Sequence, residues 1–276
     1  MNFSVAFKKL LKKMQLSPAE NPVREVRLLV GYVLGISQEK LLFDPPTEIN
    51  TEALKILSTY VERRCHHEPL AKILGYKEFW GLRFKVTAAT LDPRPDSEIL
   101  IETALKYIPD PRAPLRILDL GTGSGCLLLS LLSELPSASG VGIDLSQAAL
   151  TVAQENAQAL NLQNRCEFIQ SHWFENVFDQ FDIILANPPY IDRSEVLSPQ
   201  TLYDPETALF AADNGLADYK KILQLARSYL KDDGIIIFEI GHLQADSVNF
   251  IAQENGFNLQ VKVKDFNQLD RCLVFS

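Results

Sequence analysis

Residues 115–125 read LRILDLGTGSG, and this stretch decides the fold. Its first six residues have the apolar character of a buried strand, and a glycine-rich turn with Gly121, Gly123 and Gly125 follows them. Glycine lets a backbone turn tightly and lets a ligand approach without a Cβ in the way. Open α/β sheets bind ligands where a strand leads into a helix through such a turn. The stretch therefore predicts an α/β domain with a ligand site at this turn.

Strands and helices alternate from this point onward. The strands expected from apolar runs are 115–120, 140–145, 166–171, 181–187 and 234–241, and the expected helices are 126–135, 146–160, 215–230 and 245–256. Such continuous apolar strands indicate a parallel sheet that helices cover on both faces. Residues 258–266 and 271–276 are expected to close the sheet as an antiparallel pair. The predicted fold class is thus α/β, with a Rossmann-like sheet.

The first part of the chain, residues 1–74, shows helical signals only. Ser37 and Asn50 are N-cap candidates, and Ser17–Glu20 has the pattern of a capping box that opens another helix. The basic, amphipathic residues 1–14 fit the first helix of a domain. A membrane-surface helix or an organelle presequence is the alternative for these residues, whereas a secretory signal is disfavoured because no uninterrupted apolar core is present.

The region between these two parts has the pattern of a connector. Residues 75–92 contain β-branched and aromatic residues around Gly81, which predicts a β-hairpin linker. Asp96 then follows two prolines and is the expected cap of the next helix. The sequence therefore predicts a helical domain at 1–74, the linker, and an α/β domain at 93–276.

Composition limits the class of protein. Of 276 residues, 46% are hydrophobic and 22% are charged, and the net charge is −8. This acidic balance disfavours direct binding to nucleic acid, because neutralising phosphates requires a basic surface. No apolar run reaches the roughly 18 residues of a membrane span. The four cysteines lie singly and form no CxxC pair, so we expect no metal site, no disulfide framework and a cytoplasmic location.

The spacing of the glycine turn indicates its class of ligand. A dinucleotide turn has the pattern GxGxxG, but here the third glycine comes one residue early and Cys126 occupies its place. The turn also lacks the lysine of a phosphate-binding P-loop. Asp144 ends the next strand, where a carboxylate can accept both ribose hydroxyls of a nucleoside. Its alternative role is to interact with the start of the following helix, near Ser146.

The motif Asn187-Pro188-Pro189-Tyr190 follows an apolar strand. An amide or exocyclic amine nitrogen is a poor nucleophile because its lone pair is delocalised, and its two N–H bonds need two acceptors. The Asn187 side-chain oxygen and the Pro188 carbonyl oxygen can supply them, and the Tyr190 ring offers a face for stacking. Asn187, Pro188 and Tyr190 are therefore the candidate catalytic residues. The alternative is a turn that only ends the strand.

Together these motifs resemble the release factor glutamine N5-methyltransferases, the HemK/PrmC family. The resemblance covers nearly the whole chain and is carried by GYKEFWG, LDPRPDSE, DLGTGSG, GIDLS, QSHWF, NPPYI, DPETAL, AADNGL and FEIG. It implies a class I methyltransferase fold with S-adenosyl-L-methionine as cofactor. The implied reaction is N5-methylation of the glutamine in the Gly-Gly-Gln motif of peptide-chain release factors, which the N-terminal domain would bind.

The resemblance also assigns site residues. It implies cofactor contacts from Gly121, Thr122, Gly123, Ser124, Gly125, Asp144, Trp173 and Asn187, and it places the substrate glutamine on Asn187, Pro188, Pro189 and Tyr190. Two positions depart from the family pattern. His172 stands where an aspartate is usual, near the expected adenine ring, and Asp204 stands where a glutamate is common.

Some questions remain open at the level of sequence. The motif NPPY is shared with adenine-N6 DNA methyltransferases, so N6-adenine methylation of DNA or RNA is the main alternative function. A non-catalytic methyltransferase-like scaffold is a third hypothesis. The sequence does not assign roles to Glu239 and Arg271, nor does it identify which release factors are accepted or the oligomeric state.

Overall fold

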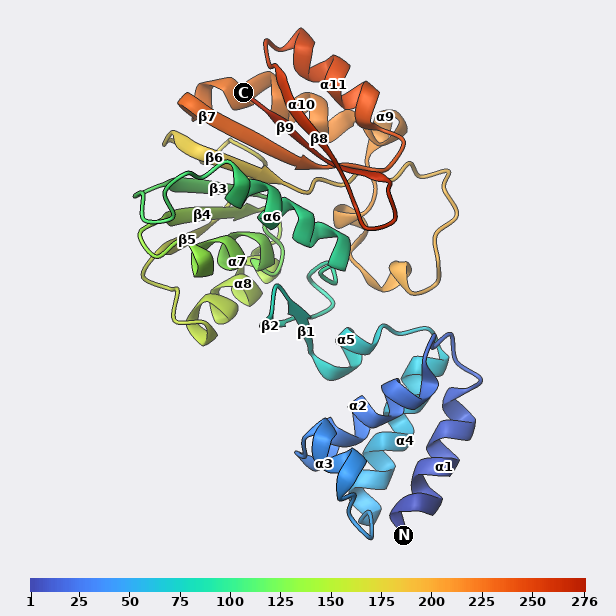
Figure 1. The fold of residues 1–276 in the computed structure, drawn as a ribbon. Helices are drawn as coiled ribbons and strands as arrows, with labels where there is room; N and C mark the ends of the chain where they lie inside the picture. The colour runs from blue at the N-terminus through green and yellow to red at the C-terminus, as the bar shows by residue number, and fades with distance from the viewer. The chain divides into compact units, whose positions relative to one another are not determined.

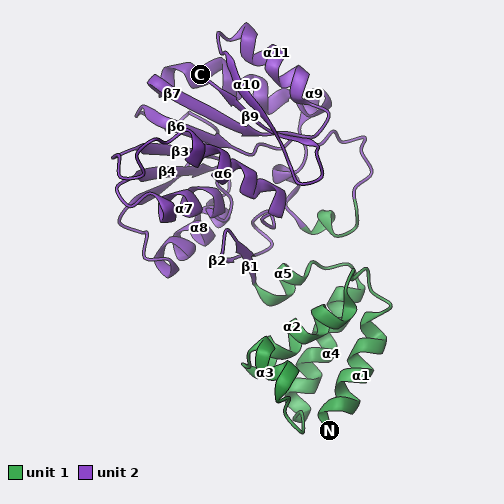
Figure 2. Ribbon diagram, in the orientation of Figure 1, with its two compact units in different colours: residues 1–75, 198–203 green, residues 76–197, 204–276 purple.

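The computed structural model describes residues 1–276, which fold into two compact units (Figure 1, Figure 2). The helical unit comprises Met1–Gly75 together with Ser198–Tyr203. The sheet unit comprises Tyr76–Leu197 together with Asp204–Ser276. The chain therefore enters the helical unit twice, the second time through a short segment for which the sequence pattern predicts no helix.

The helical unit is built from short helices that bury one face each. They are α1 (Phe3–Met14), α2 (Pro22–Leu34), α3 (Gln38–Phe43), α4 (Thr51–Cys65) and α5 (Leu70–Leu74). The first helix buries Leu10 and Met14, as expected for the first helix of a domain. In the second segment of this unit, the Tyr203 hydroxyl donates a hydrogen bond to the His66 carbonyl at 2.8 Å.

The helix starts of this unit confirm two predictions and correct a third. Ser37 and Asn50 cap α3 and α4, because their side chains accept first-turn N–H bonds at 3.1 and 2.7 Å. The capping box at Ser17–Glu20 is wrong, since α2 begins at Pro22 and the Asn21 side chain caps it at 3.0 Å. Proline at the first helical position lacks the N–H that would have no partner there, so Asn21-Pro22 makes the better helix start.

The sheet unit begins with the hairpin β1 (Tyr76–Phe79) and β2 (Leu82–Lys85). Its further strands are β3 (Arg116–Leu120), β4 (Ser139–Asp144), β5 (Cys166–Gln170), β6 (Phe181–Ala186), β7 (Leu230–Glu239), β8 (Leu259–Lys264) and β9 (Asp270–Phe275). Its helices are α6 (Glu98–Lys106), α7 (Cys126–Glu134), α8 (Gln147–Ala159), α9 (Ala212–Gly215), α10 (Ala217–Ala226) and α11 (Ala245–Glu254).

The large sheet has the strand order β5-β4-β3-β6-β7-β9-β8. All neighbours from β5 to β7 pair in parallel, and β9 pairs antiparallel with both β7 and β8. The predicted parallel sheet with an antiparallel C-terminal pair is thus confirmed. The chain builds outward from β3 in one direction and then returns to build from β6 in the other, so the order reverses between β3 and β6, where such sheets bind ligands.

Both faces of this sheet are buried, which explains the continuous apolar strands. On β6, Ile184 and Ala186 belong to the core covered by α10 and α11, whereas Ile183 and Leu185 belong to the core covered by α6 and α7. Figure 1 shows α10 and α11 in orange and red, and α6 and α7 in green. The two closely packed apolar cores hold the strand ends in place, so the site is built on a rigid part of the fold.

The start of α6 differs from the prediction. A 3-10 turn at Pro95–Ser97 leads into the helix, and no side chain caps it, so the predicted cap at Asp96 is wrong. Carbonyl groups of the turn itself already accept the first N–H bonds of the helix, which leaves a side-chain cap without a role. Asp96 lies 3.8 Å from the Arg271 guanidinium instead. None of the chain's helices combines the length and hydropathy needed to cross a bilayer.

Candidate active site

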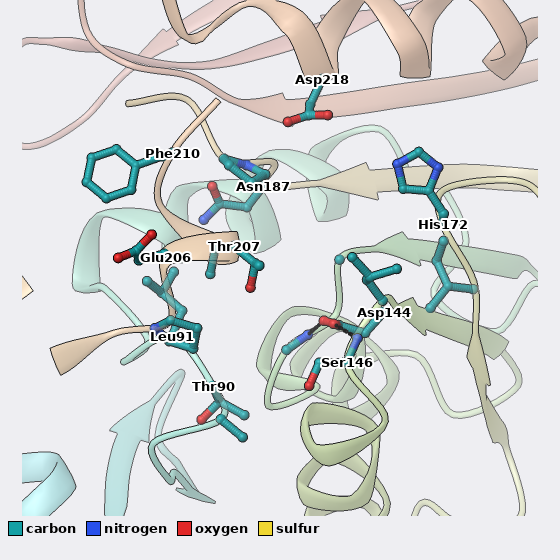
Figure 3. Close-up of a pocket in the computed structure, with 18 of the residues that line it drawn as sticks. Thr90, Leu91, Asp144, Ser146, His172, Asn187, Glu206, Thr207, Phe210 and Asp218 are labelled. Carbon is teal, nitrogen blue, oxygen red and sulfur yellow. Dashed lines mark hydrogen bonds between the residues drawn. The ribbon is translucent and has the colours of Figure 1, made fainter. Parts of the chain in front are cut away.

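A cavity of about 360 Å³ lies in the sheet unit, at the carboxyl ends of β3, β4 and β6. Figure 3 shows Asp144 and Ser146 on one side of it and Leu91, Glu206 and Thr207 on the other. Of the residues predicted for the site, Gly121, Gly123, Asp144, Trp173, Asn187 and Pro189 line the cavity, whereas Thr122, Ser124, Gly125, Pro188 and Tyr190 do not. The cavity thus joins the glycine turn and the Asn-Pro-Pro-Tyr turn.

The glycine turn requires its glycines for geometric reasons. Gly121, Gly123 and Gly125 have φ angles of +73°, +55° and +78°, a region that favours glycine. A Cβ on Gly125 would also lie 3.2 Å from the Cβ of Ala153 in α8. The Thr122 N–H donates to a carbonyl of β4 at 2.8 Å, which ties the turn to the neighbouring strand. Gly125 therefore supports the turn from behind, while Gly121 and Gly123 face the cavity.

Asp144 performs its structural role through both carboxylate oxygens. One oxygen accepts the Gly123 N–H at 2.9 Å and the other accepts the Ser146 N–H at 2.8 Å. Burial raises the pKa of Asp144, and these backbone N–H groups oppose the rise. The side chain holds the glycine turn and the start of α8 and also lines the cavity, so its contact with the helix start does not exclude contact with a ligand.

Asp119 lies beneath the turn and is buried. The Thr122 hydroxyl donates to its Oδ2 at 2.6 Å, and its Oδ1 has no hydrogen-bond partner. Burial raises the pKa of Asp119 to about 7, more than the hydrogen bond from Thr122 lowers it. Thr122 is thus committed to Asp119 by its side chain, which explains why it does not reach the cavity.

Trp173 lies against the glycine turn. Its backbone has a φ of +50°, and a Cβ placed on Gly121 would lie 3.8 Å from its ring. Its indole Nε1 is buried without a hydrogen-bond partner. The neighbouring His172 also lines the cavity, and its Nδ1 lies 3.2 Å from a carboxylate oxygen of Glu175. The two aromatic side chains therefore border the cavity next to Asp144, the side where the adenine ring was expected.

The Asn-Pro-Pro-Tyr turn is held by a carboxylate from the next strand. The Asn187 Nδ2 donates to Glu239 at 2.9 Å, and the Tyr190 hydroxyl lies 3.4 Å from the other oxygen of the same group. Asn187 lines the cavity, and its side-chain oxygen accepts no hydrogen bond from the chain. The amide therefore has one end occupied by Glu239 and an acceptor end available to a ligand.

Glu239 ends β7 and is buried. Burial raises its pKa, and the Ser97 hydroxyl and the positive charge of Arg271 act in the opposite direction. Arg271 is itself bound to Asp265 at 3.2 Å. The sequence left Glu239 and Arg271 unassigned, because the contact between Glu239 and Asn187 spans 52 residues and Arg271 lies on a different strand, β9.

The opposite wall of the cavity comes from two loops whose cavity-lining residues were not singled out from the sequence. One carries Thr90 and Leu91, and the other carries Glu206, Thr207 and Phe210. The motifs LDPRPDSE and DPETAL, which carry part of the family resemblance, were the available signals. Neither has the periodicity of a helix or strand, so periodicity alone could not locate them.

An ion pair with a buried carboxylate joins these two loops. The Asp204 carboxylate accepts the Asp92 N–H at 3.0 Å and binds the Arg94 guanidinium at 2.6 Å, and its side chain has no exposed surface. Although Asp204 is one methylene shorter than the usual glutamate, it spans the distance in this chain. The departure from the family pattern therefore leaves the two loops connected.

Two family models match the chain. A methyltransferase domain model matches residues 112–255, and a PrmC N-terminal domain model matches residues 10–75. Among solved structures, a methyltransferase from Pyrococcus furiosus is similar, with a TM-score of 0.54 and 18% identity over 79% of this chain and 98% of that one. This level of likeness supports the methyltransferase fold.

Curated relatives extend over nearly the full length. A release factor glutamine methyltransferase from Agrobacterium fabrum is 39% identical over 96% of this chain and 93% of its own length. Another from Francisella tularensis is 42% identical over 90% of this chain and 88% of its own length. This chain belongs to the release factor glutamine methyltransferase family and carries its class I, S-adenosylmethionine-dependent methyltransferase fold.

Proposed function

We propose that this chain methylates the side-chain nitrogen of the glutamine in the Gly-Gly-Gln motif of peptide-chain release factors. The observation that carries the proposal is the Asn187 side chain, whose NH2 end is bound by Glu239 at 2.9 Å and whose oxygen accepts no hydrogen bond from the chain. This amide lines the same cavity as the glycine turn. The named relatives, which match nearly the full length, support the same substrate.

The residues around the glycine turn fit S-adenosyl-L-methionine. The cavity of about 360 Å³ is of a size that holds a nucleoside-based ligand. Gly121 and Gly123 leave the backbone open to close approach, the Asp144 carboxylate borders the same space, and Trp173 provides an aromatic wall. We assign ribose binding to Asp144 and adenine contact to Trp173. When bound, the cofactor supplies an electrophilic methyl group on a sulfonium.

The turn residues have the task of holding the substrate amide. An NH2 group presents two N–H donors, and we assign the Asn187 oxygen and the Pro188 carbonyl as their acceptors. The Tyr190 ring is the proposed stacking face for the planar amide, and it follows Pro189, which lines the cavity. Holding the nitrogen in this way raises the rate of methyl transfer, because less entropy is lost when the reacting atoms are aligned. No nucleophilic side chain or metal is needed for this role.

The helical unit is the proposed docking domain for the release factor. It matches the PrmC N-terminal domain model over residues 10–75. Translation termination occurs in the cytoplasm, which is therefore the proposed location of the enzyme. The remaining residues assigned to the cofactor, Thr122, Ser124 and Gly125, are proposed to act by shaping the glycine turn, because they do not line the cavity.

The test is to incubate purified release factors with the full chain and S-adenosyl-L-methionine labelled in its methyl group. Peptide mass spectrometry should show a single added methyl on the glutamine of Gly-Gly-Gln. Duplex DNA incubated under the same conditions should gain no N6-methyladenine. Methylated adenine without methylated glutamine would reject the proposal in favour of a nucleic-acid methyltransferase, and cofactor binding without either product would reject both.

A further inference from the structure

A single buried carboxylate holds both ends of the Asn-Pro-Pro-Tyr turn. Glu239 comes from β7, 52 residues after Asn187, and contacts the Asn187 amide at 2.9 Å and the Tyr190 hydroxyl at 3.4 Å. It is 2% exposed, so water does not compete for these contacts. The position at the carboxyl end of the strand next to β6 is what brings it behind the turn.

The direction of the Asn187 amide follows from this contact. An asparagine side chain is almost symmetric in shape, so packing alone does not decide which end faces the cavity. An ionised carboxylate has no proton to donate and accepts hydrogen bonds only. The NH2 end of Asn187 must therefore point to Glu239, and the oxygen end is left for the other side.

We infer that Glu239 is a positioning residue that sets the polarity of the Asn187 amide and thereby presents an acceptor to the substrate nitrogen. The inference rests on the proposed function of the turn. If the amide were reversed, its NH2 would face the NH2 of the substrate, and two donors would oppose each other. Glu239 thus acts through Asn187 and does not itself touch the substrate.

The neighbours of Glu239 affect whether its carboxyl is ionised. Burial raises the pKa of Glu239, and the Ser97 hydroxyl and the charge of Arg271 oppose this rise by favouring the ionised form. Ser97 belongs to the LDPRPDSE stretch, and Arg271 is fixed by Asp265 at 3.2 Å. Hydrogen bonds to an ionised carboxylate are stronger than neutral ones, so the ionised form of Glu239 is the one that holds the Asn187 orientation most firmly.

The first variant of the test is Glu239→Gln, assayed as initial rates of glutamine methylation with purified release factor. A neutral amide can offer Asn187 an oxygen only by turning its own NH2 toward the neighbouring hydroxyls. We expect kcat to fall on the order of 10-fold to 100-fold, as for other losses of preorganised hydrogen bonds, while the Kd for S-adenosyl-L-methionine changes by less than about 3-fold. An equal loss of cofactor affinity would overturn the inference, because Glu239 would then serve the whole site.

A reversed pair gives the sharper test. Asn187→Asp alone places two carboxylates against each other and should be nearly inactive. In the double variant Asn187→Asp with Glu239→Gln, the amide is at position 239 and donates to the carboxylate at position 187, whose second oxygen still faces the substrate as an acceptor. We expect the double variant to exceed the Asn187→Asp single variant in kcat by about 10-fold, the converse of the loss above. A double variant no faster than that single variant would overturn the inference.

Asp182→Asn is the matched control, because Asp182 is a half-buried carboxylate at the opposite end of β6 from the turn, where it accepts the Arg116 N–H at 2.7 Å and binds Lys231. This variant should lower the free energy of unfolding and leave kcat within about 2-fold. The proposed function fails separately: in that case the wild-type chain methylates no release factor. The positioning role fails when the wild type is active and Glu239→Gln is equally active.

Discussion

The glycine-turn side of the cavity, where the cofactor is proposed to bind, and the Asn-Pro-Pro-Tyr side are built in different ways. On the cofactor side, Asp144 binds backbone N–H groups two residues after it and 21 residues before it, and the glycine turn keeps its shape through its own φ angles. On the turn side, the Asn187 side chain depends on a carboxylate 52 residues later, from another strand. The cofactor side is fixed mainly by backbone geometry, and the turn side by the pair of side chains Asn187 and Glu239.

This difference separates binding from turnover. Changes on the cofactor side remove contacts that act equally before and during reaction, so they alter affinity. Changes on the turn side alter the orientation of the substrate nitrogen and so act on the rate of the chemical step. The predictions below test this separation, beginning with the variant that should have the largest effect.

Asn187→Ala should lower kcat on the order of 10²-fold to 10³-fold, because the substrate NH2 loses one of its two assigned acceptors. The Kd for S-adenosyl-L-methionine should rise by less than about 5-fold, since binding energy on the cofactor side remains. Initial rates by mass spectrometry and isothermal titration calorimetry measure the two quantities. Turnover near that of the wild type would exclude the amide-holding role.

Asp144→Ala should weaken cofactor binding by about 10-fold to 100-fold, the effect of losing hydrogen bonds to a charged acceptor. At saturating cofactor, kcat should change much less. Ser146→Ala is the control for the helix start, because the Ser146 hydroxyl accepts the Ala149 N–H at 3.2 Å and caps α8. Equal losses of affinity in both variants would reduce Asp144 to a helix-start residue and remove its ribose assignment.

The same difference explains what could be predicted from the sequence. The strands and the glycine turn are local patterns, so their order and the position of Asp144 followed from spacing alone. The cap at Ser17 failed because Asn21-Pro22 nearby makes a better helix start. Glu239 could not be assigned, since nothing in its neighbourhood reveals that Asn187 will lie 2.9 Å away.

Other parts of the site were beyond prediction for a related reason. Thr122 lies within the glycine turn, but its hydroxyl is committed to Asp119 beneath it. Glu206 and Thr207 line the opposite wall from a loop without helical or strand periodicity. That loop is linked to the LDPRPDSE stretch by the buried Asp204. A motif can indicate that such residues matter, but only the fold shows which of them face the ligand.

Gly215→Ala should displace the Asn-Pro-Pro-Tyr turn through a clash with its backbone. Gly215 has a φ of +81°, and a Cβ there would lie 2.1 Å from the Tyr190 carbonyl oxygen, so the turn would have to shift. Gly256 is the matched control, with a φ of +78° and no atom within 4 Å of the added Cβ. Gly256→Ala should lower the free energy of unfolding by about 1–2 kcal/mol from backbone strain alone.

Urea unfolding and initial rates distinguish the two glycine variants. Gly215→Ala should be less stable than Gly256→Ala by roughly a further 1 kcal/mol or more, since overpacking adds to the strain. It should also lose turnover, whereas Gly256→Ala should keep the wild-type rate. Equal stability and equal rates in the two variants would mean that the turn adjusts freely, against a rigid turn side.

Asp119 gives the smallest expected effect on turnover, because its titration acts on stability alone. Burial raises its pKa to about 7 in the folded chain, from 3.8 when exposed. Between these values the folded state holds a proton that the unfolded state has released, so the free energy of unfolding falls as pH rises through this window. One group contributes a slope of at most about 1.4 kcal/mol per pH unit. Above pH 7 this contribution no longer changes.

Asp119→Asn removes that titration. In urea unfolding of the chain alone, the free energies of unfolding of the variant and the wild type should be most similar near pH 4. The free energy of the variant should then rise relative to that of the wild type up to about pH 7. Glu254→Gln, at an exposed carboxyl, should follow the wild-type curve throughout. A constant difference between Asp119→Asn and the wild type across the window would mean that Asp119 is ionised in the folded chain. The cofactor side would then hold a buried charge beneath the glycine turn, and its stability would depend on side-chain electrostatics as the turn side does.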